Sequence, residues 1–250
     1  VQTLLPGMGY DRGITVFSPD GRLWQVDYAM IMVNNSPTAL GASSSNGVVL
    51  AGIEKKTDAL QDRSFSHKLF IIDEHVAATV TGFTSDARIL IDVARQESQT
   101  NRLLYDEPID MNYLARRLGD IMQNYTQNAG VRPFGVSLII GGVDLLGPSV
   151  HQLDPSGIYN KYFLTASGMN RNEALEATKA VYNKSASLEA LKDVVMMGMI
   201  ASNKAEALPE VIRMAYIDAV EKKVTIAKDE EISEIFGRAS KKQPPKASEK

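Results

Sequence analysis

Short apolar segments, grouped in pairs, recur along the chain and predict β-hairpins. Thr38–Ala42 and Val48–Ile53 flank a polar turn that ends in Asn46–Gly47, and an Asn-Gly pair between two such segments is a strong hairpin signal. A second pair, Lys68–Ile72 and Val76–Thr81, follows after a charged connector. This part of the chain is therefore predicted to form two antiparallel strand pairs.

Two amphipathic helices are predicted after these strands. Thr84 or Ser85 can cap the first helix, and Asp110 can cap the second, which should end near Ala129–Gly130. Apolar side chains recur at helical spacing in the first helix (Ala87, Leu90, Ile91 and Ala94) and in the second (Leu114, Leu118, Ile121, Met122 and Tyr125). Each helix thus has one face to bury.

The second half of the chain again groups strands with helices. The predicted elements are a strand at Val136–Asp144, two more strands joined by a turn at Pro155–Gly157, the second of them at Tyr159–Ala166, helices at Arg171–Tyr182 and Ser187–Ser202, strands at Val211–Asp218 and Val224–Ile226, and a helix at Asp229–Phe236. Clustered strands that alternate with helix pairs favour a layered α+β fold, with two sheets face to face and helices outside. No composition shift marks a domain boundary. The polar tail Ala239–Lys250 is expected to be disordered.

The opening of the chain differs from the rest. It sets a short strand-like run, Ile14–Phe17, against a turn, Ser18–Gly21, and then a helix, Arg22–Val33, that is apolar on much of its surface. A tryptophan in such a helix, here Trp24, is most often buried against its own domain. However, this helix precedes a fold that already closes its own sheets, so some of its apolar surface is also compatible with a contact to another chain. The pattern alone leaves both interpretations open.

Composition narrows the class of protein. The net charge of -3 in 250 residues gives no reason to expect nucleic acid, whose binders carry a basic face. The longest apolar run, Val194–Ala201, is too short to span a bilayer, and Val1–Gly7 lacks the features of a secretory signal. The absence of cysteine excludes disulfides, thiolate metal sites and a cysteine nucleophile. A cytoplasmic protein is the simplest interpretation.

Candidate catalytic groups are sparse. The histidines His67, His75 and His151 lie far apart in the sequence, show no metal-ligand spacing and are predicted to be on the surface. Ser43–Ser45 has no neighbouring base, and the Gly141–Gly142 pair lacks the context of a phosphate loop. We therefore expect neither a metal nor a cofactor.

The opening stretch is the most specific signal in the chain. Tyr10, "TVFSPDGR" (Thr15–Arg22) and "QVDYA" (Gln25–Ala29) resemble the N-terminal signature of α-type subunits of the 20S proteasome. Further segments resemble archaeal α subunits in order and spacing, namely "TALG", "GVVLAG", "HKLFIID", "DARILIDVAR", "YTQNAGVRPFGVSLIIGGVD" and "DPSG". The resemblance implies the four-layer αββα sandwich of N-terminal nucleophile hydrolases, with the opening helix as the α-type extension. It implies a flexible gate segment at 1–9, one domain at 10–238 and a disordered tail at 239–250.

The resemblance also bears on catalysis. β-type relatives use a threonine at the very N-terminus, whose own amine can serve as base. Here the nearest hydroxyl, Thr38, is internal, and Ile53 stands at about the position where active relatives place an acidic residue. Lys68 aligns with their catalytic lysine, but a lysine alone activates nothing. A non-catalytic, structural and gating subunit is therefore expected.

By the same resemblance, Lys68 acquires another role. In α subunits the lysine at this place lies in a pocket between neighbouring subunits and pairs with the terminal carboxylate of an activator's tail. Leu23, Ser36 and Phe83 fall at positions of this docking pocket. A second set of residues, Tyr10, Asp11, Pro19 and Tyr28, matches the cluster that holds the gate open in the family.

The implied partners follow from the family. They are other α subunits in a seven-membered ring, β subunits, an ATPase or other activator that inserts its C-terminal tails, and unfolded protein substrates. Nucleic acid and membranes are not among them.

Two features depart from the family pattern. Met30–Met32 replaces charged residues, and Ser36 stands where a glycine lets an activator tail approach the backbone. These departures leave open a divergent α paralogue with altered docking. A ring-forming assembly protein outside any protease, and a hydrolase unmasked by cleavage before Thr38, also remain alternatives.

Overall fold

Two five-stranded antiparallel sheets face each other in the computed structural model, which describes residues 13, 15–54, 60, 66–203 and 207–242. The first sheet has the order β10-β9-β2-β1-β8, formed by Val224–Ile226, Ile212–Asp218, Gly47–Ile53, Ala39–Ser44 and Leu164–Ser167. The second has the order β3-β4-β5-β6-β7, formed by Leu69–Asp73, Val76–Gly82, Val136–Asp144, Gly147–Leu153 and Tyr159–Tyr162. Both predicted hairpins, β1-β2 and β3-β4, are present.

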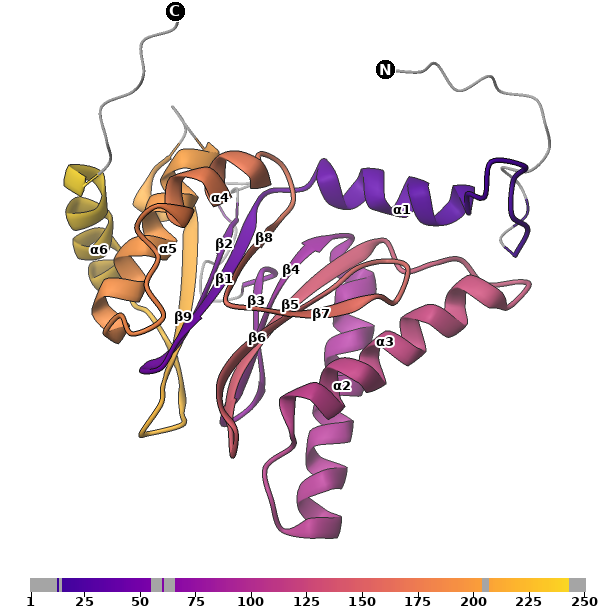
Figure 1. Ribbon diagram of the computed structural model, residues 1–250, viewed down its shortest axis with the longest axis horizontal. Helices are drawn as coiled ribbons and strands as arrows, with labels where there is room; N and C mark the ends of the chain where they lie inside the picture. The colour runs from indigo at the N-terminus through magenta and orange to yellow at the C-terminus, as the bar shows by residue number, and fades with distance from the viewer. Residues whose placement is uncertain (1–12, 14, 55–59, 61–65, 204–206, 243–250) are drawn as a thin grey trace, which may run out of the picture.

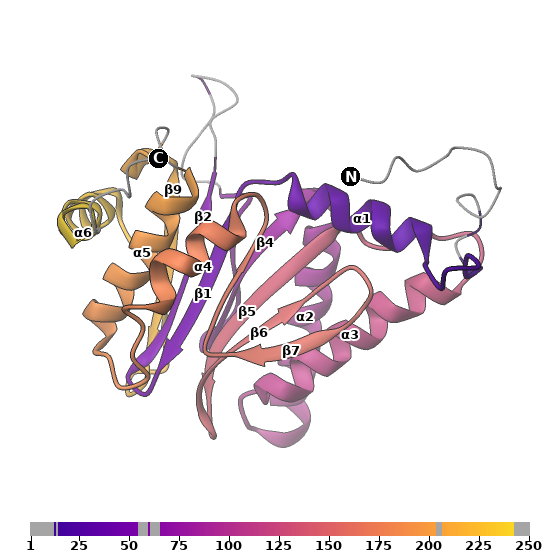
Figure 2. The ribbon, with the colours of Figure 1, turned by 45° about the horizontal axis from the view of Figure 1, so that its top comes forward.

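Helices cover the outer faces of both sheets (Figure 1). The second sheet carries α2 (Thr84–Tyr105) and α3 (Met111–Gln127), and the first carries α4 (Arg171–Lys179), α5 (Leu188–Asn203) and α6 (Asp229–Lys242). The remaining helix, α1 (Trp24–Asn34), lies across one end of the sandwich, where it contacts β4 and β5 (Figure 2). The predicted four-layer αββα sandwich with an N-terminal helix extension is therefore confirmed.

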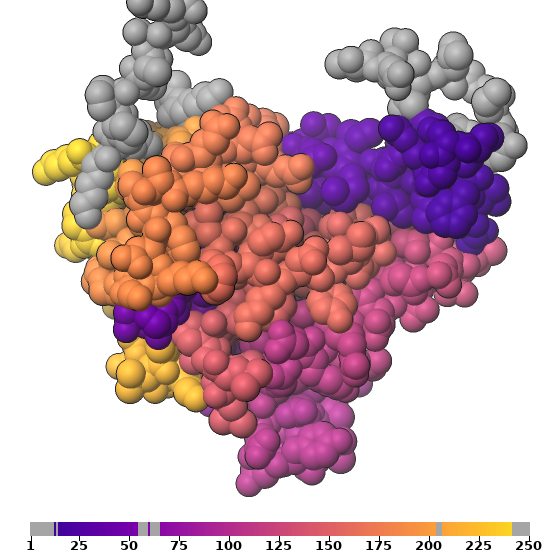
Figure 3. Space-filling model, viewed as in Figure 1, coloured from indigo at the N-terminus to yellow at the C-terminus, as the bar shows by residue number. Residues whose placement is uncertain are grey.

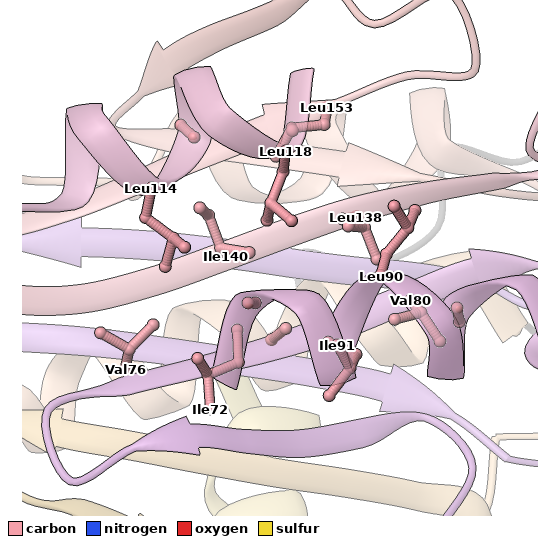
Figure 4. Close-up of a cluster of buried hydrophobic side chains, with 14 of the residues drawn as sticks. Ile72, Val76, Val80, Leu90, Ile91, Leu114, Leu118, Leu138, Ile140 and Leu153 are labelled. Carbon is pink, nitrogen blue, oxygen red and sulfur yellow. The ribbon is translucent and has the colours of Figure 1, made fainter. Parts of the chain in front are cut away.

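The core is divided into three layers of buried side chains. Figure 4 shows the layer between the second sheet and its helices, where Leu114 and Leu118 of α3 meet Ile140 of β5. Comparable layers lie between the first sheet and α4–α6 and between the two sheets. The lack of side chains at Gly41 and Gly141 lets the two sheets approach closely. An added Cβ at Gly41 would lie only 2.6 Å from Ile139 Cγ2, and one at Gly141 only 2.6 Å from Val48 Cγ1.

Local signals predict one helix end correctly and two incorrectly. Asp110 caps α3 as predicted, since its carboxylate accepts a hydrogen bond from the Tyr113 N–H at 2.8 Å. Neither Thr84 nor Ser85 caps α2, because the helix already begins at Thr84, with Phe83 at the N-cap and no side-chain cap bond. At the other end of the chain, α6 runs to Lys242 and buries Ala239, so residues 239–242 are helical rather than part of a disordered tail.

Two predicted strands differ in the structure. Residues 15–17 form no strand, and Val16 and Phe17 are exposed. The single predicted strand Tyr159–Ala166 is two strands, β7 and β8, which belong to different sheets. The break falls at Phe163, whose carbonyl accepts a hydrogen bond from the Ser43 N–H, so that the chain crosses to β1 at this point.

The prediction that all three histidines lie on the surface is wrong for two of them. His75 and His151 are buried, and only His67 is exposed. His75 hydrogen-bonds through Nε2 to the Ile109 carbonyl, and His151 through Nε2 to Asn112, both at 3.0 Å. These polar partners are supplied by the α2–α3 connection and by α3, which the local sequence around each histidine does not reveal.

Candidate functional site

Lys68, at the entrance to β3, has a buried side chain. Its ammonium donates hydrogen bonds to the carbonyls of Pro37 at 3.1 Å and Val80 at 3.0 Å, and only 9% of the residue is exposed. Gly52 lies beside the aliphatic stem, where an added Cβ would be 3.4 Å from Lys68 Cβ and only 2.9 Å from Thr79 Oγ1. The ammonium thus links the segment before β1 to the end of β4.

Burial changes the acidity of this group. Loss of hydration lowers the pKa of Lys68 to about 8, and the nearby carboxylate of Glu54 opposes this shift. Glu54 is itself held by the hydroxyl of Ser66 at 2.9 Å and the N–H of His67 at 2.6 Å. Lys68 is therefore mostly, but not completely, charged near neutral pH, in a setting where an anion would be a strong partner.

The segment before β1 is tied to the structure through Ser36 and Thr38. The Ser36 hydroxyl donates to the Met32 carbonyl at 3.0 Å, and the Ser36 carbonyl accepts from the Met169 N–H at 2.8 Å. The Thr38 hydroxyl donates to the Met169 carbonyl. Ser36 therefore turns its hydroxyl back onto the last turn of α1, and the Thr38 hydroxyl is occupied by the main chain.

The N-terminal end of α1 carries other residues of the two predicted sets. Leu23 is the half-buried N-cap residue of α1, while Pro19 and Tyr28 are exposed. Tyr28 lies beside Trp24, with ring centroids 6.3 Å apart. Tyr10 and Asp11 lie outside the described residues.

A pocket of about 340 Å³ lies beside α1. Its lining is mainly apolar and consists of Gln25, Tyr28, Ala29, Met32, Phe83, Arg132, Pro133 and Gly135. It brings Phe83 of the predicted docking set together with Tyr28 of the predicted gate set. Lys68, Leu23 and Ser36 do not line it, so among the described residues this pocket holds only Phe83 of the four predicted docking residues.

An ion pair holds the wall of this pocket. Arg132 binds both carboxylate oxygens of Asp86, at 2.6 and 2.8 Å, and the Gly135 N–H donates to the same carboxylate at 2.9 Å. Burial opposes the charge on Asp86, but these hydrogen bonds prevail and lower its pKa. The Arg132 guanidinium also lies 5.7 Å from the centre of the Phe83 ring. The sequence analysis does not assign Arg132, Asp86 or Met32 to a site.

Two further observations concern the part of the chain that the structure describes. No group of three His, Cys, Asp or Glu side chains gathers there as a metal site would require. None of the helices described there is long and apolar enough to cross a membrane.

The fold and the site define a nucleophile-hydrolase-like sandwich whose first strand is preceded by a helical extension and whose Thr38, at the start of that strand, is internal. The "Proteasome subunit" family model matches residues 33–217, and the model of the N-terminal signature of A-type proteasome subunits matches residues 10–30. The chain belongs to the proteasome subunit family and is of the α type.

Curated relatives match over most of their length. The chain is similar to "Proteasome subunit alpha" of Archaeoglobus fulgidus, with 42% identity over 95% of this chain and 96% of the relative. It is 41% identical to the protein of the same name from Methanothermobacter thermautotrophicus, over 91% and 92% of the two chains. For the Methanosarcina acetivorans protein the identity is 44% over 81% of each chain.

Proposed function

We propose that the chain is a non-catalytic subunit of the α ring of a 20S proteasome, which forms the entry ring, templates the β ring and docks an activator in the cytoplasm. The α-type signature and the relatives named "Proteasome subunit alpha" support the ring assignment. Support for the docking role comes from one observation above all: the buried ammonium of Lys68 is bonded to two carbonyls, with no carboxylate among the described residues at hydrogen-bond distance.

A docked carboxylate would complete this arrangement. An ammonium has three N–H donors, and the carbonyls of Pro37 and Val80 accept two of them. The third is available for a peptide C-terminus, which binds a cation strongly in a partly dry site. The Ser36 hydroxyl is satisfied by Met32, so Ser36 in place of glycine need not compete with the incoming tail.

The absence of catalytic activity in this chain is part of the proposal. Thr38 follows Pro37 in an unbroken chain, so its nitrogen is an amide and cannot act as a base. Its hydroxyl is held by the Met169 carbonyl, and Ile53 at the end of β2 is buried and apolar. Intact-mass analysis of the mature chain tests this, since a hydrolase unmasked before Thr38 would show a new N-terminus there.

The docking role is tested with the assembled particle. Lys68→Ala should abolish activator-stimulated degradation of folded substrates and leave small-peptide cleavage by the β ring nearly intact. Lys179→Ala, which removes an exposed lysine at the end of α4, is the control and should leave stimulation unchanged. Unchanged stimulation in Lys68→Ala would remove Lys68 from the docking role.

The gate is the second part of the proposed function. Residues 1–9 would close the entry, and the cluster of Tyr10, Asp11, Pro19 and Tyr28 would hold the open form. Deletion of residues 1–9 should raise basal peptide hydrolysis by the assembled particle. No rise would argue against a gate in this segment.

A further inference from the structure

The backbone around Lys68 is held by one carboxylate, that of Glu54 directly after β2. Its Oε2 accepts a hydrogen bond from the Ser66 hydroxyl at 2.9 Å, and its Oε1 accepts one from the His67 N–H at 2.6 Å. The Ser66 oxygen in turn accepts hydrogen bonds from the N–H groups of Lys68 at 3.1 Å and Leu69 at 3.2 Å. Glu54 and Ser66 thus fix the backbone at the point where the Lys68 side chain leaves it.

The charge of Glu54 is balanced by an arginine of the neighbouring strand. Arg213 Nε, in β9, lies 3.5 Å from Glu54 Oε2, and the two side chains are only 14% and 15% exposed. Arg213 Nη1 also donates to Asp229 at the start of α6, at 3.1 Å. Because Glu54 and Arg213 are largely buried, solvent screens their charges little. Glu54 therefore acts on two cations, on Arg213 through an ion pair and on Lys68 through space.

We propose that Glu54 is a positioning residue for the docked carboxylate. It fixes the backbone that carries Lys68 and keeps the ammonium in its charged form, while Arg213 limits the negative charge that an incoming carboxylate meets. This inference rests on the docking role of Lys68 in the proposed function. It adds to that role the residues that set the pH range over which docking occurs.

Glu54 has two opposing effects on docking. Its negative charge stabilises the ammonium form of Lys68, whose pKa burial lowers to about 8, but the same charge repels a peptide carboxylate. Near pH 8 the first effect decides, because a lysine that has lost its proton cannot bind a carboxylate as a cation. At pH 6.5 Lys68 is charged with or without Glu54, so removal of Glu54 should not weaken docking there.

Other charged groups lie at the same end of the molecule. The Glu54 N–H donates to the carbonyl of Val211 at 2.7 Å, in the 3-10 turn Pro209–Val211 that leads into β9. Among the described residues, the other charged or titratable side chains at this end of the surrounding elements are His67, Glu210, Lys228 and Asp229. Lys68 is the group whose pKa, at about 8, falls in the middle of the alkaline range.

Two substitutions with opposite expected effects test the proposal in the assembled particle. Glu54→Gln keeps an oxygen that can accept from the His67 N–H but removes the charge. The alkaline fall of activator-stimulated degradation should therefore move to lower pH, by at least about half a pH unit. Arg213→Gln removes the cation that competes with Lys68 for the charge of Glu54, so the fall should move to higher pH.

The probe is an ATPase activator from the same source, assayed between pH 6.5 and pH 9. The same ATPase without its C-terminal residues gives the unstimulated baseline, and small-peptide cleavage by the β ring shows that each particle is assembled. Glu54→Gln alone decides the test if Arg213→Gln does not assemble.

Two control variants separate charge from structure. Ser66→Ala removes a hydrogen bond to Glu54 but no charge, so the fall should stay at the wild-type pH even if stimulation is lower. Glu176→Gln removes an exposed carboxylate of α4, a helix that forms part of the surface in Figure 3. It should change neither the stimulation nor its pH dependence.

The outcomes distinguish this inference from the proposed function. Opposite shifts in Glu54→Gln and Arg213→Gln support the positioning role, because a merely structural role would lower stimulation in both variants and leave the fall in place. A fall that stays in place or moves to higher pH in Glu54→Gln, with stimulation lost in Lys68→Ala, would overturn this inference and leave the docking role intact. Unchanged stimulation in Lys68→Ala would overturn both.

Discussion

Lys68 donates a hydrogen bond to the carbonyl oxygen of Pro37, whose carbonyl carbon is bonded to the nitrogen of Thr38. In an N-terminal threonine enzyme this nitrogen would be a free amine. Here the ammonium of Lys68 instead fixes the chain between α1 and β1 and, through Val80, the end of β4. The Lys68 side chain thus links these two segments, and its third N–H donor is available to an anion.

Activator docking should depend on pH through Lys68. Because burial lowers the pKa of Lys68 to about 8, the free site loses its charge as pH rises from 7 to 9. Activator-stimulated degradation should fall over this range more steeply than peptide cleavage does. Lys68→Arg keeps its charge, so any stimulation that this variant retains should be independent of pH in the same window. A wild-type particle with flat stimulation would contradict the assignment.

His151 should make the folded chain less stable in mild acid. Burial, and then the positive charge of Lys161, lower the pKa of His151 to about 4, below its ordinary value of 6.5. Folding therefore favours the neutral form of His151. The contribution of this preference to the free energy of unfolding is complete above pH 6.5 and is lost as pH falls toward 4. Between pH 7 and pH 5 the loss amounts to about 2 kcal/mol.

The measurement is the urea midpoint of the isolated chain at both pH values, for wild type and His151→Gln. The variant should lose less stability on acidification, by about the same 2 kcal/mol. Equal losses in the two proteins would show that another group is responsible.

The layer between the second sheet and its helices should contribute strongly to stability. Leu118 of α3 is fully buried, so Leu118→Ala should lower the free energy of unfolding by about 2–5 kcal/mol. Leu103 near the end of α2 is 87% exposed, and Leu103→Ala should change the free energy of unfolding by less than about 0.5 kcal/mol. Chemical denaturation of the two variants gives the comparison, and similar costs would contradict the described packing.

Two glycines with positive φ should differ sharply on substitution. At Gly130 (φ 92°) an added Cβ meets nothing within 4 Å, so Gly130→Ala costs only backbone strain, about 1 kcal/mol. At Gly82 (φ 114°) a Cβ would lie 2.2 Å from the Gly135 carbonyl oxygen, so Gly82→Ala adds a backbone clash and should cost about 3 kcal/mol or more. Thermal unfolding of both variants checks the order, and equal costs would contradict the close contact between Gly82 and Gly135.

Local chemistry explains which elements were predictable. The Asn46–Gly47 hairpin and the Asp110 cap depend on residues within a few positions of one another, and both were predicted from the sequence. The break at Phe163 depends on pairing with β1, which lies far away in the chain, so the pattern of Tyr159–Ala166 predicted one strand. Burial of His151 likewise depends on α3, which packs over β6.

The candidate site also contains some residues that local sequence motifs indicate and others that only the fold brings together. Lys68 and Phe83 are singled out because their sequence positions resemble a family, not because their spacing indicates a pocket, and their docking role stays a prediction. The ion pair between Asp86 and Arg132 joins residues 46 positions apart, and no periodic pattern connects them. Met32 was noted in the sequence as an unusual apolar residue, but its place in the pocket follows only once α1 is set against Gly135.

The central claim is tested most directly by native mass spectrometry of the chain alone and after mixing with a β-type subunit from the same source. A closed ring that captures β subunits and gains peptidase activity is the predicted result. A monomer that is indifferent to β subunits would contradict it, because α1 would then not be an assembly surface.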